Sequence, residues 1–360
     1  MRAPDVLTVP GLLADPVALT RALVDIESVS GNEQLIAAAV EAVLGGAGHL
    51  DVERSGNTLV ARTNLGRSRR VVLAGHLDTV PVAGNLPARI DGDRMYGCGT
   101  CDMKSGLAIA LHLAATLPAP RYDVTYVFYE CEEVDAVRNG LYQLAERAPD
   151  RLTDADFAVL LEPTHGLIEA GCQGTLRATV QTSGKRAHSA RSWLGHNAIH
   201  AMAPVLTRLV EYRPREVLID GCRFREGLNA VRIDGGVAGN VIPDAGAVEV
   251  NFRFAPDRSV DAAIEHVTQV FAGFAVEVVD VAPGALPGLD TEAGRELLRA
   301  VGQPPRAKLG WTDVARFATV GVPALNFGPG DPNLAHARDE HVEIDKIRVG
   351  AETMRRWLTP

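Results

Sequence analysis

Histidine and acidic side chains follow three apolar segments of the chain, directly where each segment ends. His76 comes directly after VVLAG, and Glu162 comes directly after FAVLL. Glu132 and Glu133 are the two residues that follow VTYVFYEC. In parallel α/β sheets, residues beyond the carboxyl ends of the strands converge on one edge. Each residue alone is typical of a loop that starts after a strand, but together they predict a shared site.

Three further residues extend this predicted site. Asp102 stands in the loop GCGTCDMKSG at or near the start of an expected helix, and a carboxylate that caps a helix with one oxygen keeps the other free. Asp78 stands two residues after His76. Its carboxylate could accept a hydrogen bond from the imidazole nitrogen of His76 that does not bind a metal. His336 follows a late strand and the loop NFGPGDP, and the nearby His341 is an alternative to it.

This set of side chains indicates a hydrolytic metal centre. Imidazole and carboxylate without thiolate are the ligands of hydrolytic Zn²⁺, Co²⁺ or Mn²⁺ sites, and two histidines with three carboxylates suit two ions that share one carboxylate. Such a pair lowers the pKa of a bound water from about 15.7 towards about 7. One carboxylate must stay unligated to take the proton of that water. Because adjacent strand residues point in opposite directions, we expect Glu132 and Glu133 to divide these roles.

The elements that position these residues form an α/β pattern. Two amphipathic helical stretches are expected between Asp15 and Leu44, and a further helix follows Asp102. Strands alternate with helices, and each strand is apolar throughout, which indicates a mainly parallel sheet covered on both faces. The expected strands are Thr58 to Arg62, Val71 to Ala74, Val124 to Glu130 and Phe157 to Leu161.

The pattern changes near Ala178. From there the expected order is β-α-β-β-α-β, the arrangement of a ferredoxin-like module. A segment rich in Pro and Gly, Ala282 to Asp290, is typical of a linker. A helix from Thr291, the strand VPALNFG and a closing helix near Ile347 then return to the first domain. We therefore expect a discontinuous catalytic domain, residues 1–177 and 283–360, and an inserted α+β module, residues 178–282.

Composition excludes several classes of partner. The chain has 360 residues, a net charge of -9 and no block of Lys or Arg, which argues against nucleic acid. No apolar run reaches the roughly 18 residues that a membrane span needs. The segment MRAPDVLTVPGLLADPVALT lacks the apolar core of a signal peptide, so a cytoplasmic location is expected. Five cysteines at irregular spacing favour reduced thiols.

The loop before Asp102 allows two other interpretations. GCGTCD is partly similar to a dinucleotide-binding motif, but the third glycine and a preceding buried strand are missing. Cys98 and Cys101 have the spacing of a redox motif without a thioredoxin-like context, and small buried thiols are the simpler interpretation. The sharper hypothesis is that a Cys98–Cys101 disulfide displaces Asp102 and suppresses activity.

Over nearly its whole length the chain resembles the dinuclear zinc amidohydrolases, which include deacetylases, aminoacylases and carboxypeptidases. This resemblance implies a zinc-exopeptidase-like fold and two Zn²⁺ ions per subunit, for which Co²⁺ can substitute. It implies that His76, Asp102 and Glu162 hold one ion, that Asp102, Glu133 and His336 hold the other, that Glu132 is the general base and that Asp78 orients His76. The matching segments, in family order, are GHLDTVP, YGCGTCDMKSG, ECEEV, LEPT, GKRAHSARSWLGHNAIH, GNVIPD, NFRFAPDRS and HARDEHVEI.

The same resemblance gives roles to the inserted module. It implies a homodimer formed through that module, in which His188 reaches the partner's active site and stabilises the oxyanion. Asn240, Arg253 and Thr175 match positions that bind the substrate, and Arg suits a carboxylate through its two-pronged geometry. The chain departs from the family at Cys131, where an acid is usual, and at His196, where Glu or Lys is commoner. Neither departure removes a proposed ligand.

Within the family, GCGTCDMKSG, GCQGTLRATV and LGWTDVARF are most similar to actinobacterial members that hydrolyse N-succinyl-L,L-2,6-diaminopimelate, in the biosynthesis of lysine and cell-wall precursors. The expected partner is thus a small N-acyl amino acid dicarboxylate. Three alternatives stay open: a deacylase of another N-acyl amino acid such as N-acetylornithine, a dipeptidase, and a catalytically silent metal-binding assembly protein. The metal motifs do not separate the enzymes, because specificity lies in pocket contacts. Hinges at Ala282 to Asp290 and near Arg177 would allow domain closure.

Overall fold

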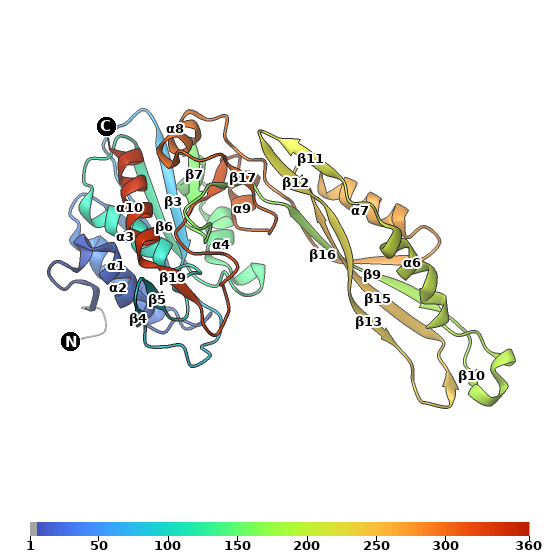
Figure 1. Ribbon diagram of the computed structural model, residues 1–360. Helices are drawn as coiled ribbons and strands as arrows, with labels where there is room; N and C mark the ends of the chain where they lie inside the picture. The colour runs from blue at the N-terminus through green and yellow to red at the C-terminus, as the bar shows by residue number, and fades with distance from the viewer. Residues whose placement is uncertain (1–5, 360) are drawn as a thin grey trace. The chain divides into compact units, whose positions relative to one another are not determined.

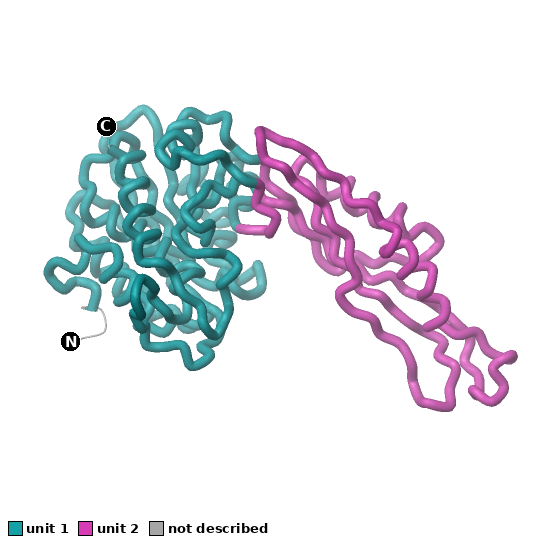
Figure 2. Tube along the Cα trace, viewed as in Figure 1, with its two compact units in different colours: residues 1–171, 287–306, 313–360 teal, residues 172–286, 307–312 magenta. Residues whose placement is uncertain are grey.

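A computed structural model of the chain describes residues 6–359; residues 1–5 and 360, which fall within the expected catalytic domain, lie outside the described residues. The chain divides into two compact units, coloured separately in Figure 2. Unit 1 comprises residues 1–171, 287–306 and 313–360, and unit 2 comprises residues 172–286 and 307–312. Strand β9 (Gly174–Ser183) starts before the expected boundary at residue 178, because both of its strand partners lie in unit 2.

The core of unit 1 is an eight-stranded sheet with the order β1-β2-β6-β3-β7-β18-β8-β17; Figure 1 labels its strands β3, β6, β7 and β17. Its four central strands β6, β3, β7 and β18 are parallel, whereas β1, β2 and β8 pair antiparallel. The expectation of a mainly parallel sheet therefore holds for the centre and not for the edges. The bounds are β1 Asp51–Ser55, β2 Thr58–Arg62, β3 Arg70–His76, β6 Asp123–Tyr129, β7 Phe157–Leu160, β8 Glu169–Ala170, β17 Arg306–Ala307 and β18 Ala324–Asn326.

Helices cover both faces of this sheet, since every residue of β6 and β7 is buried. Helix α3 (Lys104–Thr116) packs against β3 and also contacts α1 (Pro16–Val24) and α10 (Ile344–Leu358) (Figure 1). The remaining helices of unit 1 are α2 Gln34–Gly46, α4 Gly140–Arg147, α5 Asp150–Thr153, α8 Glu292–Val301 and α9 Val314–Thr319, with short 3-10 turns η2 Leu12–Ala14 and η3 Ala136–Arg138. None of the helices within residues 6–359 combines the length and the apolar character that crossing a membrane requires.

A second, three-stranded sheet of unit 1 was not expected from the sequence. It has the order β19-β5-β4, formed by β4 (Arg89–Asp91), β5 (Arg94–Tyr96) and β19 (His341–Glu343). His341 pairs with Tyr96 in this sheet, and the two rings lie 4.8 Å apart. The sheet thus accounts for His341 and leaves His336 as the histidine available to the predicted site.

Unit 2 has the expected β-α-β-β-α-β order, in the elements β9, α6 (Ala203–Glu211), β13 (Gly227–Gly235), β15 (Ala245–Phe254), α7 (Val260–Val270) and β16 (Ala275–Ala282). The sheet order is β13-β15-β9-β16, all antiparallel. One face of β9 and β15 alternates buried side chains such as Leu176, Val180 and Phe252, which form the core under the helices.

Unit 2 also contains small elements beyond this order. The hairpin of β11 (Glu216–Ile219) and β12 (Cys222–Arg225) turns at Asp220 and Gly221, both with positive φ. An Asp-Gly pair between strand-like runs is a hairpin signal, so the sequence carried this information. The other elements are β10 Ala187–His188, which pairs with β14 Val241–Ile242, and the 3-10 turns η4 Ser189–Leu194 and η5 His200–Met202.

Candidate metal centre

The ends of β3, β6 and β7 bring the predicted histidine and acidic residues of unit 1 together. The ligand atoms of His76, Asp102 and Glu162 all lie within 4.8 Å of one another, and so do those of Asp102, Glu133 and His336. His76 is the last residue of β3, and Glu162 follows β7 by two residues. Asp102 is common to both groups.

The carboxylate of Asp102 lies between two imidazoles. Its Oδ1 is 3.1 Å from Nε2 of His76, and its Oδ2 is 3.5 Å from Nε2 of His336. Nε2 of His336 is also 2.8 Å from Oε1 of Glu133. Burial works against the charged carboxylate, but its hydrogen bonds with His336 and His76 hold the pKa of Asp102 below the ordinary value. One carboxylate with an oxygen directed at each of two histidines has the arrangement that a bridging ligand needs.

His76 is held so that one ring nitrogen is available to a metal. Its Nδ1 lies 3.0 Å from the backbone carbonyl oxygen of Asp78, while its Nε2 faces Asp102. An imidazole whose Nδ1–H donates to a carbonyl presents the lone pair of Nε2. The donor set of two imidazoles and three carboxylates therefore fits two ions of the Zn²⁺ or Co²⁺ type.

Asp78 contacts more than the histidine for which it was predicted. Its carboxylate is 3.5 Å from Nδ1 of His76, farther than its own backbone carbonyl. The carboxylate accepts hydrogen bonds from the backbone N–H of Glu132 (3.0 Å) and of Glu133 (3.1 Å), and from the hydroxyl of Ser30 (2.6 Å). Burial raises the pKa of Asp78, but the contacts with His76 and these donors outweigh it and lower the pKa to about 2. Asp78 thus fixes the backbone that carries both glutamates.

The expected reason for separate roles of Glu132 and Glu133 was wrong. Both residues lie in a turn after β6 ends at Tyr129, and Cys131 has a φ of 58°. The different neighbours of the two glutamates therefore follow from this turn and not from strand alternation. Glu133 joins Asp102 and His336, whereas Glu132 groups with His76 and Glu133. Burial, reinforced by the carboxylate of Asp313, raises the pKa of Glu132 well above its ordinary value.

Asp102 does not cap helix α3 with its side chain. The N-cap residue is Met103, and no side chain caps the helix. Both carboxylate oxygens of Asp102 are instead directed at the imidazoles. Asp102 therefore lies next to the start of the helix, as expected. The expectation that one of its oxygens caps the helix was wrong.

The four predicted residues of unit 2 form two separate pairs. His188 is exposed in β10, its Nδ1 accepts from the N–H of Ala190 (3.1 Å), and the next residue, Ser189, donates to the carbonyl of Asn240 (2.9 Å). Thr175 and Arg253 are direct partners across β9 and β15. Between the two pairs runs most of β9, which at about 3.3 Å per residue spans roughly 25 to 30 Å.

Asn251 was missed by the sequence reasoning. Its Oδ1 accepts from Nε of Arg253 (3.1 Å), and its Nδ2 donates to the hydroxyl of Thr175 (3.2 Å). Asn251 stands two residues before Arg253 on the same face of β15, and this i, i+2 relation was the available signal. Burial lowers the pKa of Arg253, so its guanidinium is partly desolvated.

All five cysteines are buried, and none forms a disulfide within the part of the chain that the structure describes. The thiols of Cys98 and Cys101 face different carbonyls, those of Val80 (3.6 Å) and Asp331 (2.7 Å). Burial raises the pKa of both thiols, which disfavours the reactive thiolate. The preceding strand β5 belongs to the small antiparallel sheet, so the loop also lacks the context of a dinucleotide site.

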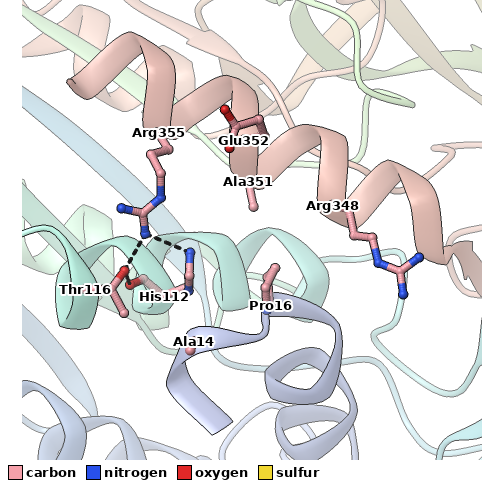
Figure 3. A pocket seen from close by; sticks show the side chains of 8 residues that line it. All are labelled: Ala14, Pro16, His112, Thr116, Arg348, Ala351, Glu352 and Arg355. Atoms are coloured by element: carbon pink, nitrogen blue, oxygen red, sulfur yellow. Dashed lines mark hydrogen bonds between the residues drawn. The ribbon is translucent and has the colours of Figure 1, made fainter. Parts of the chain in front are cut away.

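A cavity of about 540 Å³ lies elsewhere in unit 1, and side chains that line it hydrogen-bond one another (Figure 3). Nδ1 of the buried His112 lies 2.7 Å from the carbonyl of Leu13, and Arg355 donates to its Nε2 (3.0 Å) and to the hydroxyl of Thr116 (2.5 Å). Arg355 thereby lies at the C-terminal end of α3, where a cation complements the helix dipole. None of the predicted site residues lines it; the lining is Ala14, Pro16, His112, Thr116, Arg348, Ala351, Glu352 and Arg355.

Taken together, parallel strand ends that carry an imidazole–carboxylate cluster and an inserted β-α-β-β-α-β unit define a class of metal-dependent hydrolases. The sequence model of peptidase family M20/M25/M40 matches residues 72–359, and the chain belongs to this family. It is a metal-dependent amide hydrolase, so the catalytically silent alternative has no support.

Two relatives match over almost the full length. The chain is 58% identical to a putative succinyl-diaminopimelate desuccinylase of Mycobacterium tuberculosis, covering 96% of this chain and 99% of the relative. It is 50% identical to a succinyl-diaminopimelate desuccinylase of Corynebacterium glutamicum, covering 97% and 98%. The expected family and its actinobacterial branch are thereby confirmed.

Solved structures share the fold at low sequence identity. A tripeptidase from Staphylococcus aureus has a TM-score of 0.76 at 23% identity and covers 96% of this chain and 97% of its own. A Bacillus subtilis protein described as a dinuclear metal binding peptidase of the M20 family has a TM-score of 0.69 at 15% identity, with coverages of 95% and 96%. These likenesses confirm the expected fold class.

Proposed function

We propose that the chain hydrolyses the succinyl amide of N-succinyl-L,L-2,6-diaminopimelate in the cytoplasm, releasing succinate and L,L-diaminopimelate for lysine and cell-wall precursor synthesis. The observation that carries amide hydrolysis is the carboxylate of Asp102 between His76 and His336, with Glu132 beside them. The substrate is supported by the two desuccinylase relatives, at 58% and 50% identity over nearly the whole chain.

The proposed cofactor is a pair of Zn²⁺ ions, with Co²⁺ as a substitute. His76, Asp102 and Glu162 would hold one ion, and Asp102, Glu133 and His336 the other. When bound, the ions supply Lewis acidity that polarises the amide carbonyl and makes water more acidic. The imidazole–carboxylate donor set and the position of Asp102 between His76 and His336 support this assignment.

Glu132 is proposed to move the proton. It takes a proton from the attacking water as the new C–O bond forms, and it gives that proton to the amide nitrogen as the C–N bond breaks. A carboxyl group that must hold a proton between these steps benefits from a raised pKa, which burial and Asp313 give to Glu132. Asp78 serves this step by fixing the backbone N–H of Glu132.

Arg253 is proposed to bind a carboxylate of the substrate, together with Thr175. Its guanidinium is half-buried, and within residues 6–359 it has no carboxylate partner. An Arg that is partly desolvated and oriented by Asn251 is prepared for a two-pronged hydrogen bond with an anion. Because Asn240 lies beside His188 and roughly 25 to 30 Å from Arg253 along β9, the partner subunit's Asn240 is proposed to act at the same substrate.

A homodimer is proposed to complete the site, with the partner's His188 stabilising the oxyanion. Within unit 2, His188 lies at the opposite end of β9 from Thr175 and Arg253, which supports a contribution to another subunit. The edge strand β13 supports the interface, because among residues 6–359 it pairs only with β15, and it exposes Val231 (55%) and Ile233 (54%). Exposed apolar edges of this kind favour pairing with another chain.

Comparison of kcat/KM on three substrates tests the proposed specificity. N-succinyl-L,L-diaminopimelate should exceed N-acetyl-L-ornithine and a dipeptide by at least about 100-fold, because pocket contacts that pair with charged groups discriminate strongly. A higher kcat/KM on acetylornithine or on the dipeptide would assign one of those activities instead. Loss of turnover on chelation, with recovery on added Zn²⁺, checks the metal requirement in the same assay.

A further inference from the structure

The side chain of Glu340 is almost completely buried beside the loop that carries Asp102. It is 1% exposed. Its Oε1 accepts from the backbone N–H of Cys101 (2.8 Å) and of Asp102 (3.1 Å), and its Oε2 accepts from the N–H of Gly99 (3.1 Å). The backbone carbonyl of Glu340 also accepts from the N–H of Gly97 (3.0 Å). One residue therefore accepts four hydrogen bonds from residues 97–102.

A buried carboxylate is costly unless donors surround it, and here the donors are backbone amides of one loop. Charge-assisted hydrogen bonds to backbone N–H groups are strong and fix geometry. The amides can converge because the loop turns tightly, with Gly99 at a φ of 80°. The shape of the loop and the position of Glu340 are consequently coupled.

Glu340 follows His336 by four residues in the same loop. Asp102 and His336, which lie on separate loops, are thus joined through this one side chain. The position of His336 depends on such a contact, because its side chain is 49% exposed and little packing holds it, and because its backbone has a φ of 64°. His76 does not need it, because it is 1% exposed and ends a central strand.

We propose that Glu340 is a positioning residue that sets the spacing between Asp102 and His336 and thereby determines the affinity of one metal position, the one formed by Asp102, Glu133 and His336. The other position shares Asp102, but its remaining ligands His76 and Glu162 are held at the ends of β3 and β7, so it depends less on Glu340. We therefore expect the position held by the ends of β3 and β7 to fill first, so that Glu340 would affect mainly the binding of the second ion. This inference rests on the metal assignment proposed above.

Titration of the metal-free, full-length protein with Co²⁺ tests the proposal, read by calorimetry and by the visible absorption of the bound ion. E340Q keeps the size of the side chain but directs an amide NH₂ at backbone donors. We expect the second Co²⁺ to bind about 10- to 100-fold more weakly and the first to change by less than about threefold. E340D, which is one methylene shorter, should give an intermediate effect.

D339N is the matched control. It removes the same charge one residue away, and Asp339 is exposed and contributes only its backbone carbonyl to a hydrogen bond, with His341. D339N should bind both ions as the wild type does. Equal weakening in D339N and E340Q would show a general charge effect and overturn the proposal, as would weakening of the first step alone in E340Q.

Two results separate this inference from the metal assignment. If the wild type binds fewer than two ions, the assignment fails; if the wild type binds two and E340Q binds both unchanged, only the role of Glu340 fails. Should both Glu340 variants fail to fold, hydrogen exchange in the metal-free wild type decides. The amides of Gly99, Cys101 and Asp102 should then be protected. Fast exchange at all three would contradict their hydrogen bonds with Glu340.

Discussion

The carboxylate of Asp102 lies 3.1 Å from the imidazole of His76, although 25 residues, including strands β4 and β5, separate them in the chain. Because the other oxygen of Asp102 faces His336, D102A should remove a ligand from both proposed ions. We expect bound zinc to fall from about two ions per subunit to one or none, and kcat to fall by more than about 100-fold. Metal analysis of the purified protein and initial rates measure this. D93N, which replaces an exposed aspartate, should keep both ions, and full metal content in D102A would contradict the bridging role.

Glu132 and Glu133 are neighbours whose substitutions should have different effects. E132Q should keep its metal content and lose about 10²- to 10⁴-fold in kcat, because it removes the proton carrier alone. E133Q should instead bind its second ion more weakly, because Glu133 lies with Asp102 and His336. Metal content and kcat measured on both proteins check the assignment. The same pattern in both variants would be evidence against separate roles.

Much of the catalytic unit could be predicted from the sequence. Continuous apolar segments located β3, β6 and β7 within a residue or two, because strands buried on both faces need such composition. Residues at or just past the ends of these strands meet at one edge, so the sequence alone could group His76, Glu132, Glu133 and Glu162. Asp102 and His336 stand in loops, whose place in the chain made them candidates, but their assignment to two ligand sets came from the family resemblance.

The supporting contacts could not be predicted in the same way. Glu340 and Asp78 act through backbone N–H groups, which every residue has and which leave no pattern in the sequence. The left-handed backbone of Cys131 is also unusual for a residue other than glycine. The short strands β4, β5 and β19 have three residues each, too few for a periodic signal.

Exchange of subunits between two inactive variants tests the proposed dimer. H188A lacks the imidazole and E132Q lacks the base, so each protein alone should have little activity. In a mixed dimer, one site combines Glu132 of one subunit with the partner's His188. After mixing at equal amounts and full exchange, we expect recovery of about a quarter of wild-type activity, because half of the dimers are mixed and each has one intact site. A mixture that stays inactive, with exchange confirmed by mass spectrometry, would assign His188 to its own subunit or to no catalytic role.

Mild oxidation should not inactivate the enzyme through Cys98 and Cys101. Their thiols are buried, they face different carbonyls, and burial raises their pKa, so little thiolate is available for disulfide formation. Rates before and after treatment with oxidised glutathione should agree, with mass spectrometry showing free thiols. The C98A variant should behave identically. Inactivation together with a Cys98–Cys101 disulfide would restore the redox hypothesis.

Lys104 should make the stability of the protein depend on pH in the alkaline range. It is the first residue of α3, is 1% exposed, and its Nζ donates to the carbonyl of Ile26 (2.7 Å). Burial lowers the pKa of Lys104 from 10.5 to about 8. Below pH 8 the ammonium is charged in both the folded and the unfolded protein, so the full cost of burying it is present. Between about pH 8 and 10.5 only the unfolded protein holds the proton, and this cost therefore diminishes as pH rises.

K104M should reveal this cost as a difference in slope. The interval between the two pKa values of Lys104 corresponds to a cost of roughly 3 kcal/mol for burying the charged ammonium. The free energy of unfolding of K104M relative to the wild type should therefore be highest near pH 7. It should fall by about 2 kcal/mol by pH 10. The hydrogen bond that K104M loses shifts its curve by the same amount at every pH and does not change the slope. Urea unfolding at several pH values measures both proteins, with K185M, at an exposed lysine, as the control that should run parallel to the wild type. Parallel curves for K104M and the wild type would mean that Lys104 keeps its ordinary pKa in the folded chain.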